Sequence, residues 1–272
     1  MMKRHPLNDT FHWRNHDGPR RLVSDEQARA YDELGYFILE DAFDAERAAA
    51  VAELIDPFEA RMTQFLRTQN DGKLFIAQAD AITFTVHLAA QCPELREFVS
   101  DPVFQGLTHD LIGPDVRLYW DQAVYKKPEP DREFPWHQDN GYTFIEPQDY
   151  LTCWVALTDA HADNGCPWVV SRRHHEGTLE HTMTDLGWQC LEKPEDAEPL
   201  PVRAGSIAVF SSLTPHRTGP NRTEDVRKSY IVQYAPSGAM RIDLDSSGNR
   251  QETPQDTPER QFEILRNGQP VG

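Results

Sequence analysis

The residues best suited to chemistry are a histidine and an aspartate two positions apart, His137 and Asp139. On an extended strand, residues i and i+2 point to the same face, so one imidazole nitrogen and one carboxylate oxygen can reach the same metal ion. A facial triad needs a third ligand from a distant strand, and His216 is the best candidate because it follows an apolar stretch at 207–210. The histidine–aspartate pair alone is a weak signal, since two polar surface residues would have the same spacing.

Two histidines and one carboxylate leave positions open for oxygen chemistry on Fe(II), while zinc competes for the same ligand types. Arg227, eleven residues after His216, favours iron with 2-oxoglutarate. If both lie on neighbouring antiparallel strands, the planar guanidinium can bind the distal carboxylate of 2-oxoglutarate while the 2-oxo acid end binds the metal. Thr218 would point to the same side as His216 and add a hydroxyl. Taken alone, Arg227 would more often form a surface ion pair.

The elements that must position these residues are helical first. Ser24 and Gln27 have capping-box spacing and predict a helix that ends before Gly35. A second helix is expected from about Asp44 into the sixties. A third helical region covers roughly 94–112, with Pro102 as an internal break or restart.

From Val116 the pattern changes to short strands separated by turns. The strands are expected at 116–125, 151–158, 168–170, 206–210 and 229–234. Helices followed by many short strands predict an α+β fold: a double-stranded β-helix (jelly-roll, cupin-like) core with the N-terminal helices packed on one sheet.

The length of 272 residues suits one domain, or at most two, and we expect a single oxygenase domain. We expect an irregular N-terminal segment at 1–22, a mainly helical part at 23–115, the jelly-roll core at 116–236 and a C-terminal tail at 237–272. Within this tail, 245–262 is polar and strand-poor, and we expect it to be a loop or surface tail.

Composition limits the partners. The net charge is −17, from 44 acidic and 27 basic residues, which repels phosphate backbones and anionic lipids. We therefore expect a small-molecule substrate, with neither nucleic acid nor membrane as the main partner. No secretory signal is expected at the N-terminus, and four scattered cysteines favour the cytoplasm. The sequence leaves the oligomeric state open.

The sequence resembles the phytanoyl-CoA dioxygenase family of Fe(II)/2-oxoglutarate oxygenases over roughly residues 24–236. The matching segments are Asp32–Ile38, Trp136–Asp139, Trp154–Ala160 and Asp163–Val170, together with the spacing of His216 and Arg227. The resemblance implies that His137, Asp139 and His216 bind Fe(II). It also implies that Arg227 and Thr218 hold 2-oxoglutarate, with Gln122 and Trp154 lining its pocket and O2 as the other cosubstrate.

The resemblance further implies hydroxylation of an unactivated C–H bond with release of succinate and CO2. Asp139 is present where the family's halogenases carry Gly or Ala, so hydroxylation or a related oxidation is the expected outcome. The family does not fix the substrate, which could be a CoA ester, an amino acid or a natural product.

Substrate contacts are expected from aromatic residues near the motif, namely Phe134, Tyr142 and Trp168, although some of these would simply be core residues. The chain also departs from its relatives: Arg172 and Arg173 stand where they carry glycine and serine. Either arginine could meet an anionic group of the substrate, but a solvated turn is the favoured interpretation.

Two other functions stay open. One is a non-catalytic protein that binds a 2-oxo acid or a metal on the same barrel. The other is a cupin-type metalloenzyme that does not use 2-oxoglutarate. Arg227 and Trp154 are the residues that argue against the second alternative.

Overall fold

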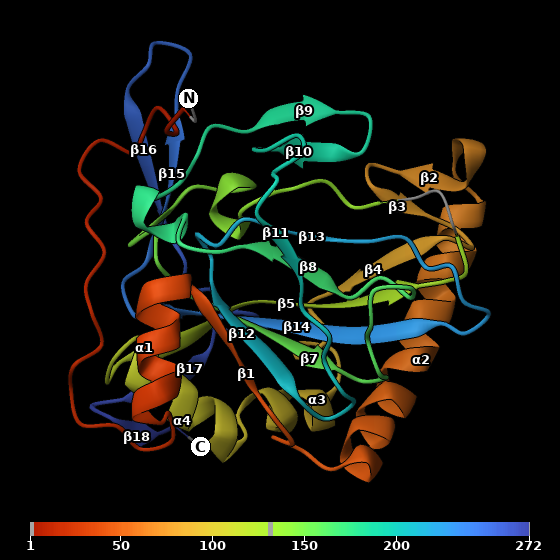
Figure 1. Cartoon of the computed structure of the whole chain (residues 1–272), viewed down its shortest axis with the longest axis horizontal. Coiled ribbons are helices and arrows are strands. Elements are labelled where there is room, and N and C mark those ends of the chain that lie inside the picture. Colours follow the sequence, from red (N-terminus) through yellow and green to blue (C-terminus); the bar gives the residue numbers. More distant parts are fainter. Residues whose placement is uncertain (1–2, 130–132, 272) are drawn as a thin grey trace.

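The structure is a computed structural model that describes residues 3–129 and 133–271 (Figure 1). Its largest sheet has the strand order β1-β12-β7-β14-β5-β4-β3-β2, with β17 paired to β5 and β18 to β17. The bounds are β1 Tyr36–Leu39, β2 Lys73–Leu74, β3 Ala77–Gln78, β4 Ile82–Val86, β5 Val116–Lys126, β7 Leu151–Ala156, β12 Ile207–Ser211, β14 Arg227–Pro236, β17 Glu263–Arg266 and β18 Gln269–Pro270.

A smaller sheet faces one side of this large sheet. It has the order β11-β8-β13, formed by Ala197–Pro199, Pro167–Val170 and His216–Thr218. Isolated bridges at His137 and Trp136 extend it beyond β13. Two hairpins complete the strands: β9 Thr182–Thr184 with β10 Gly187–Gln189, and β15 Met240–Leu244 with β16 Arg250–Pro254, where β15 also pairs with β6 Ile145–Glu146. The two facing sheets confirm the predicted jelly-roll core.

The helices are α1 Asp25–Leu34, α2 Ala45–Arg67, α3 Pro93–Val99 and α4 Pro102–Leu111, with short 3-10 turns at Asn70–Gly72, Asp139–Gly141 and His174–Glu176. The capping box predicted for α1 is present, because Ser24 Oγ accepts from Gln27 N and Gln27 Oε1 accepts from Ser24 N. Gly35 ends the helix with φ 90°, a left-handed value that suits glycine. Pro102 starts α4 at its first position, where the missing N–H costs nothing.

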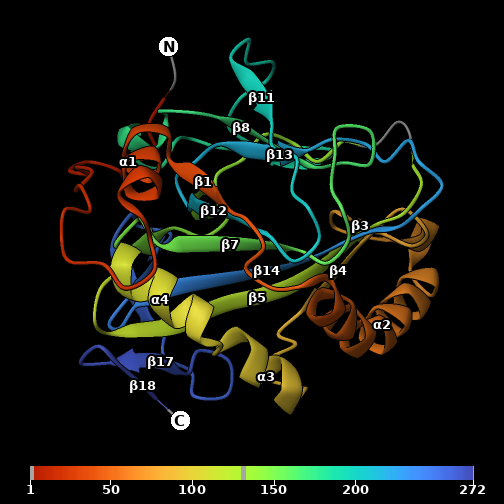
Figure 2. The ribbon, with the colours of Figure 1, turned by 60° about the horizontal axis from the view of Figure 1, so that its bottom comes forward.

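Helices α2, α3 and α4 cover one face of the large sheet (Figure 2). Alternate residues of β14 point to this face, where Tyr230, Val232 and Tyr234 join one buried apolar cluster with α3 and α4. The intervening residues Arg227, Ile231 and Gln233 point to the opposite face and line a cavity. The alternation of β14 therefore separates a packed core from the interior of the barrel.

Two predicted segments contain more strand than expected. The part expected to be mainly helical includes β4, whose Thr83 and Thr85 are buried, with the Thr83 hydroxyl bonded to Glu59 of α2. The expected C-terminal tail contains four strands, β15 to β18. Within 245–262, the prediction of a loop is wrong for β16, which pairs with β15 along five residues. Its side chains are all exposed, so no apolar alternation marks it in the sequence.

Candidate functional site

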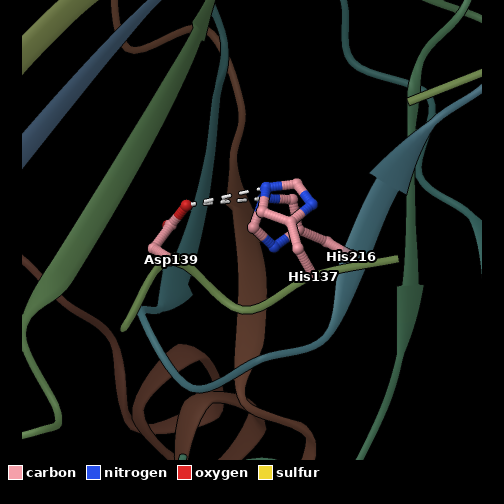
Figure 3. Close-up of side chains that lie close together, drawn as sticks. All are labelled: His137, Asp139 and His216. Atoms are coloured by element: carbon pink, nitrogen blue, oxygen red, sulfur yellow. Dashed lines mark ion pairs between the residues drawn. The ribbon is translucent and has the colours of Figure 1, made fainter. Parts of the chain in front are cut away.

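His137, Asp139 and His216 meet on the cavity side of the barrel (Figure 3). Asp139 Oδ1 lies 3.9 Å from His137 Nε2 and 3.7 Å from His216 Nε2. One potential ligand atom from each residue lies within 4.8 Å of the others. Metal–ligand bonds of roughly 2 Å span such separations. The three residues therefore fit a single metal ion, as the sequence predicted.

The two histidines are paired directly across an antiparallel bridge. His137 N–H donates to the His216 carbonyl at 2.9 Å, and His216 N–H donates to the His137 carbonyl at 2.8 Å. The second ring nitrogens also have partners, since His137 Nδ1 lies 2.9 Å from the Pro135 carbonyl and His216 Nδ1 lies 3.0 Å from the Thr214 carbonyl. A carbonyl only accepts, so each Nδ1 carries the proton and each Nε2 keeps its lone pair toward the metal position.

Burial and the neighbouring His216 lower the pKa of His137 well below its ordinary value. The ring is therefore neutral at physiological pH, which is the state that binds a metal ion.

Asp139 does not continue the strand, because it begins the 3-10 turn Asp139–Gly141. Its orientation comes from β7 and β14. Thr152 Oγ1 donates to Asp139 Oδ2 at 2.6 Å and accepts from Gln233 Nε2 at 3.2 Å. The free oxygen, Oδ1, is then the one that faces the histidines. Sequence reasoning missed Thr152 and Gln233, because their relation to Asp139 depends on strand pairing.

Gln138, between the two ligands, is fully buried and anchors them on the side away from the cavity. Its amide donates to the carbonyls of Gly177 and Leu213 and accepts from Leu179 N. Its backbone N–H donates to His181 Nε2 at 3.0 Å. Burial lowers the pKa of His181 to about 4, so its ring stays neutral and can accept this bond.

Arg227 lies at the start of β14 and is 1% exposed. Nη1 donates to the Val124 carbonyl at 3.2 Å and to the Ser229 hydroxyl, whereas Nε and Nη2 have no hydrogen-bond partner in the described part of the chain. Burial lowers its pKa to about 10, so the guanidinium remains charged at neutral pH. A buried cation with two unused donors fits a carboxylate such as the distal end of 2-oxoglutarate.

The strands that carry His216 and Arg227 differ from those expected. His216 is on β13 of the small sheet and Arg227 is on β14 of the large sheet, so the two are not on neighbouring strands. They face one cavity from opposite walls. Thr218 points to the same side as His216, as expected, because both line this cavity from β13.

The cavity has a volume of about 590 Å³ and contains most of the predicted site residues. Gln122 and Trp154 line it from β5 and β7, and the guanidinium carbon of Arg227 lies 5.2 Å from the Trp154 ring centroid. Phe134 and Tyr142 also line it, with their rings nearly parallel at 12°.

Three residues expected to contact substrate are not brought to this cavity. Arg173 pairs with Asp196 at 3.0 Å, and Arg172 N–H donates to the Leu34 carbonyl. Trp168 is paired with Arg217 across β8 and β13, and this guanidinium lies 5.3 Å from the ring centroid. The positions of Arg172 and Arg173 are those of a turn that packs beside α1, in line with the favoured interpretation of these arginines.

The profile of the phytanoyl-CoA dioxygenase (PhyH) family matches residues 31–229 of this chain. The chain belongs to the phytanoyl-CoA dioxygenase family. It is therefore an Fe/2-oxoglutarate-dependent dioxygenase, and the cavity combines a His-Asp-His metal site with a buried arginine, as this chemistry requires.

Two relatives match most of the length of this chain. Phytanoyl-CoA dioxygenase domain-containing protein 1 of Mus musculus is 24% identical over 259 residues, covering 77% of this chain and 89% of that protein. The ectoine dioxygenase of Bordetella bronchiseptica is 25% identical over 244 residues, covering 78% of this chain and 75% of that protein.

The fold also matches solved structures. The epimerase SnoN, crystallised with Fe3+, alpha ketoglutarate and nogalamycin RO, superposes with a TM-score of 0.67 at 20% identity, covering 88% of this chain and 98% of that one. This likeness supports the jelly-roll fold. Within the described residues, no helix combines the length and apolar character needed to cross a bilayer.

Proposed function

We propose that the chain hydroxylates an unactivated C–H bond of a small molecule, with His137, Asp139 and His216 as the Fe(II) ligands. Arg227 and Thr218 would bind the distal carboxylate of 2-oxoglutarate, with Gln122 and Trp154 beside it. When bound, the iron centre supplies the redox chemistry that couples conversion of 2-oxoglutarate to succinate and CO2 with hydroxylation of the substrate.

The residues of the protein position the metal ligands and the cosubstrate, and they shield His137 from bulk water. The backbone carbonyls of Pro135 and Thr214 hold the imidazoles in one tautomer, and Thr152 turns one Asp139 oxygen away from the histidines. Buried Arg227, which is 1% exposed, would neutralise a carboxylate of the cosubstrate. Phe134 and Tyr142 lie next to His137, with ring centroids 4.7 Å and 5.2 Å from its own, and shield this ligand from bulk water.

The observation that carries the proposal is the unused pair of donors on buried Arg227, in the same cavity as the triad. A structural arginine would be expected to find an anion within the protein. A metalloenzyme that does not use 2-oxoglutarate would have no need of this cation.

An anaerobic titration tests the proposal. Addition of 2-oxoglutarate to the Fe(II)-loaded protein should produce the weak visible charge-transfer band of the metal chelate, and air with substrate should release succinate. Arg227→Met should keep metal binding but lose most of the affinity for 2-oxoglutarate. A band without succinate for any substrate would indicate a binding protein, and metal binding without a band would indicate a cupin-type enzyme.

We also propose that the whole chain is one oxygenase domain. One buried cluster includes residues from Val23 near the N-terminus to Leu265 near the C-terminus. A cytoplasmic location is proposed because Cys92, Cys153, Cys166 and Cys190 are all free thiols.

A further inference from the structure

We propose that the substrate is an electrically neutral, largely apolar molecule. This inference rests on the proposed function, because it assumes that iron and 2-oxoglutarate occupy the charged groups of the cavity. It concerns what remains of the cavity after both have bound.

The charged groups are few and already assigned. Among the described residues that line the cavity, the side chains with a formal charge at neutral pH are Asp139 and Arg227. In the proposed function, Asp139 binds the metal and Arg227 binds a carboxylate. A carboxylate, phosphate or ammonium on the substrate would then lose its hydration without an opposite charge, which is strongly unfavourable.

The strand register gives the positions of the charged groups along β14. Arg227 is paired with Lys126, and Gln233 is paired with Trp120 and Thr152. Arg227 and Gln233 are six residues apart on β14, which corresponds to about 20 Å along the strand. Thr152 holds Asp139 near the second of these pairs, and the proposed cosubstrate lies between the Asp139 carboxylate and the Arg227 guanidinium. Buried Lys126 lies at the Arg227 end, where its ammonium contacts the Gly219 carbonyl.

The rest of the wall is apolar and lies on β4 and β5. Phe84 and Val86 face the cavity from β4, and Trp120 faces it from β5. Phe84 continues the aromatic wall to the metal ligands, with ring centroids 5.8 Å from Phe134, which in turn lies 4.7 Å from His137. A substrate that approaches the metal therefore passes along aromatic and aliphatic side chains.

The rim of the cavity is also apolar. Leu74 and Phe75, at the turn between β2 and β3, line the cavity yet are 50% and 59% exposed. Opposite them, Trp188 lines the cavity from β10. The two hairpins approach closely at Gly187, where a Cβ would lie 2.9 Å from Ile76 Cγ2. Exposed apolar side chains at a cavity rim mark a surface that an apolar ligand can cover.

Neutral polar groups in the lining limit the substrate further. The side chains of Tyr119, Thr143 and Gln233 line the cavity and can bond a hydroxyl or a carbonyl. They can orient a neutral molecule with one or two polar substituents. They do not provide a counter-charge for an ion.

Size-matched pairs of neutral and anionic probes test this inference. Protein loaded with redox-inert Mn(II) and 2-oxoglutarate is titrated by calorimetry with 2-naphthylmethanol against 2-naphthoate, and with decanol against decanoate. We expect the alcohol of each pair that binds to bind at least about tenfold more tightly than its carboxylate. Val86→Lys, which adds a cation to the β4 wall, should narrow this ratio by strengthening carboxylate binding.

The outcomes separate this inference from the proposed function. Binding of 2-oxoglutarate is measured first on the same sample, and its absence overturns the proposed function together with this inference. If 2-oxoglutarate binds, a carboxylate that equals or exceeds its alcohol overturns this inference alone, as does the failure of every neutral probe to bind.

Discussion

At the scale of single residues, every potential ligand atom of the triad is oriented by a specific hydrogen bond. Backbone carbonyls fix His137 and His216, and the hydroxyl of Thr152 fixes Asp139. None of these bonds contributes a metal ligand, but each reduces the freedom that the ligands would lose on binding a metal ion.

Replacement of Arg227 by methionine should weaken 2-oxoglutarate binding by about a hundredfold, because a buried charged partner of the carboxylate is lost. Metal affinity should change little, since Arg227 does not contact the triad. Calorimetric titrations of 2-oxoglutarate and of Mn(II) measure the two effects separately. Equal 2-oxoglutarate affinity in the variant and the wild type would remove Arg227 from the site.

Replacement of Thr152 by valine should weaken metal binding by about ten- to a hundredfold, because the variant keeps the shape but loses the donor to Asp139. Thr152→Ser keeps the hydroxyl and is the matched control. Titration of the apoprotein with Mn(II) measures the effect without turnover. A wild-type affinity in Thr152→Val would show that the hydrogen bond does not position Asp139.

The sequence predicts the role of a residue best where spacing along the chain alone determines the direction of its side chain. His137 and Asp139 were found because they are two positions apart, and Arg227 because its position after His216 fits a carboxylate-binding arginine. Thr152 could not be found this way, since its contact with Asp139 depends on how β7 lies beneath the histidine segment. Arg172 and Arg173 were considered as substrate contacts with a solvated turn as the favoured interpretation, and the fold turns them toward Leu34 and Asp196.

At the scale of elements, helices and strands with a clear period or an apolar run were predicted, and some strands that lack both were missed. The helix from Ala45 to Arg67 and the alternating strand at Leu151–Ala156 have clear periods. Strand β4 has five residues and buries threonines on one side, so it lacks a polar face that would mark it. Strand β17 has four residues, and its pairing with β5 brings together segments that are more than a hundred residues apart.

Strand β17 should contribute strongly to stability despite its length. Leu265 is 0% exposed and belongs to the main buried cluster. Leu265→Ala should lower the free energy of unfolding by about 2–5 kcal/mol, since it leaves a cavity in that cluster. Leu244→Ala, at a site that is 50% exposed, is the control and should change it by less than about 0.5 kcal/mol. Urea denaturation gives both values, and similar losses would contradict the placement of β17 in the core.

At the scale of the whole molecule, buried histidines link stability to pH. His174 is fully buried between the N-terminal segment and the barrel, with Nε2 3.0 Å from the Asp32 carbonyl and its ring against Trp13. Burial and the nearby His175 lower the pKa of His174 to about 4 from 6.5. As pH falls, the unfolded chain takes up this proton first, so folding stability declines.

The contribution of neutral His174 to the free energy of unfolding should be fully present above about pH 6.5. The free energy of unfolding should then decline by up to about 3 kcal/mol as the pH falls to about 4. His174→Gln should reduce the dependence on pH in this range by about one proton. His12→Gln, which removes an exposed imidazole, is the control. Urea denaturation at several pH values tests this, and an unchanged slope in His174→Gln would show that His174 does not cause the loss.

The buried guanidinium of Arg227 has a consequence beyond binding. An ion without a counter-ion destabilises the folded apoprotein, and a bound dicarboxylate removes that penalty. A ligand held only by the folded chain adds about 2.7 kcal/mol of stability at a hundred times its dissociation constant. Proteases act on transiently unfolded chains, so the lifetime of this protein in the cell should lengthen when its cosubstrate is abundant and shorten when it is scarce. A single side chain would thereby couple protein turnover to the supply of a central metabolite.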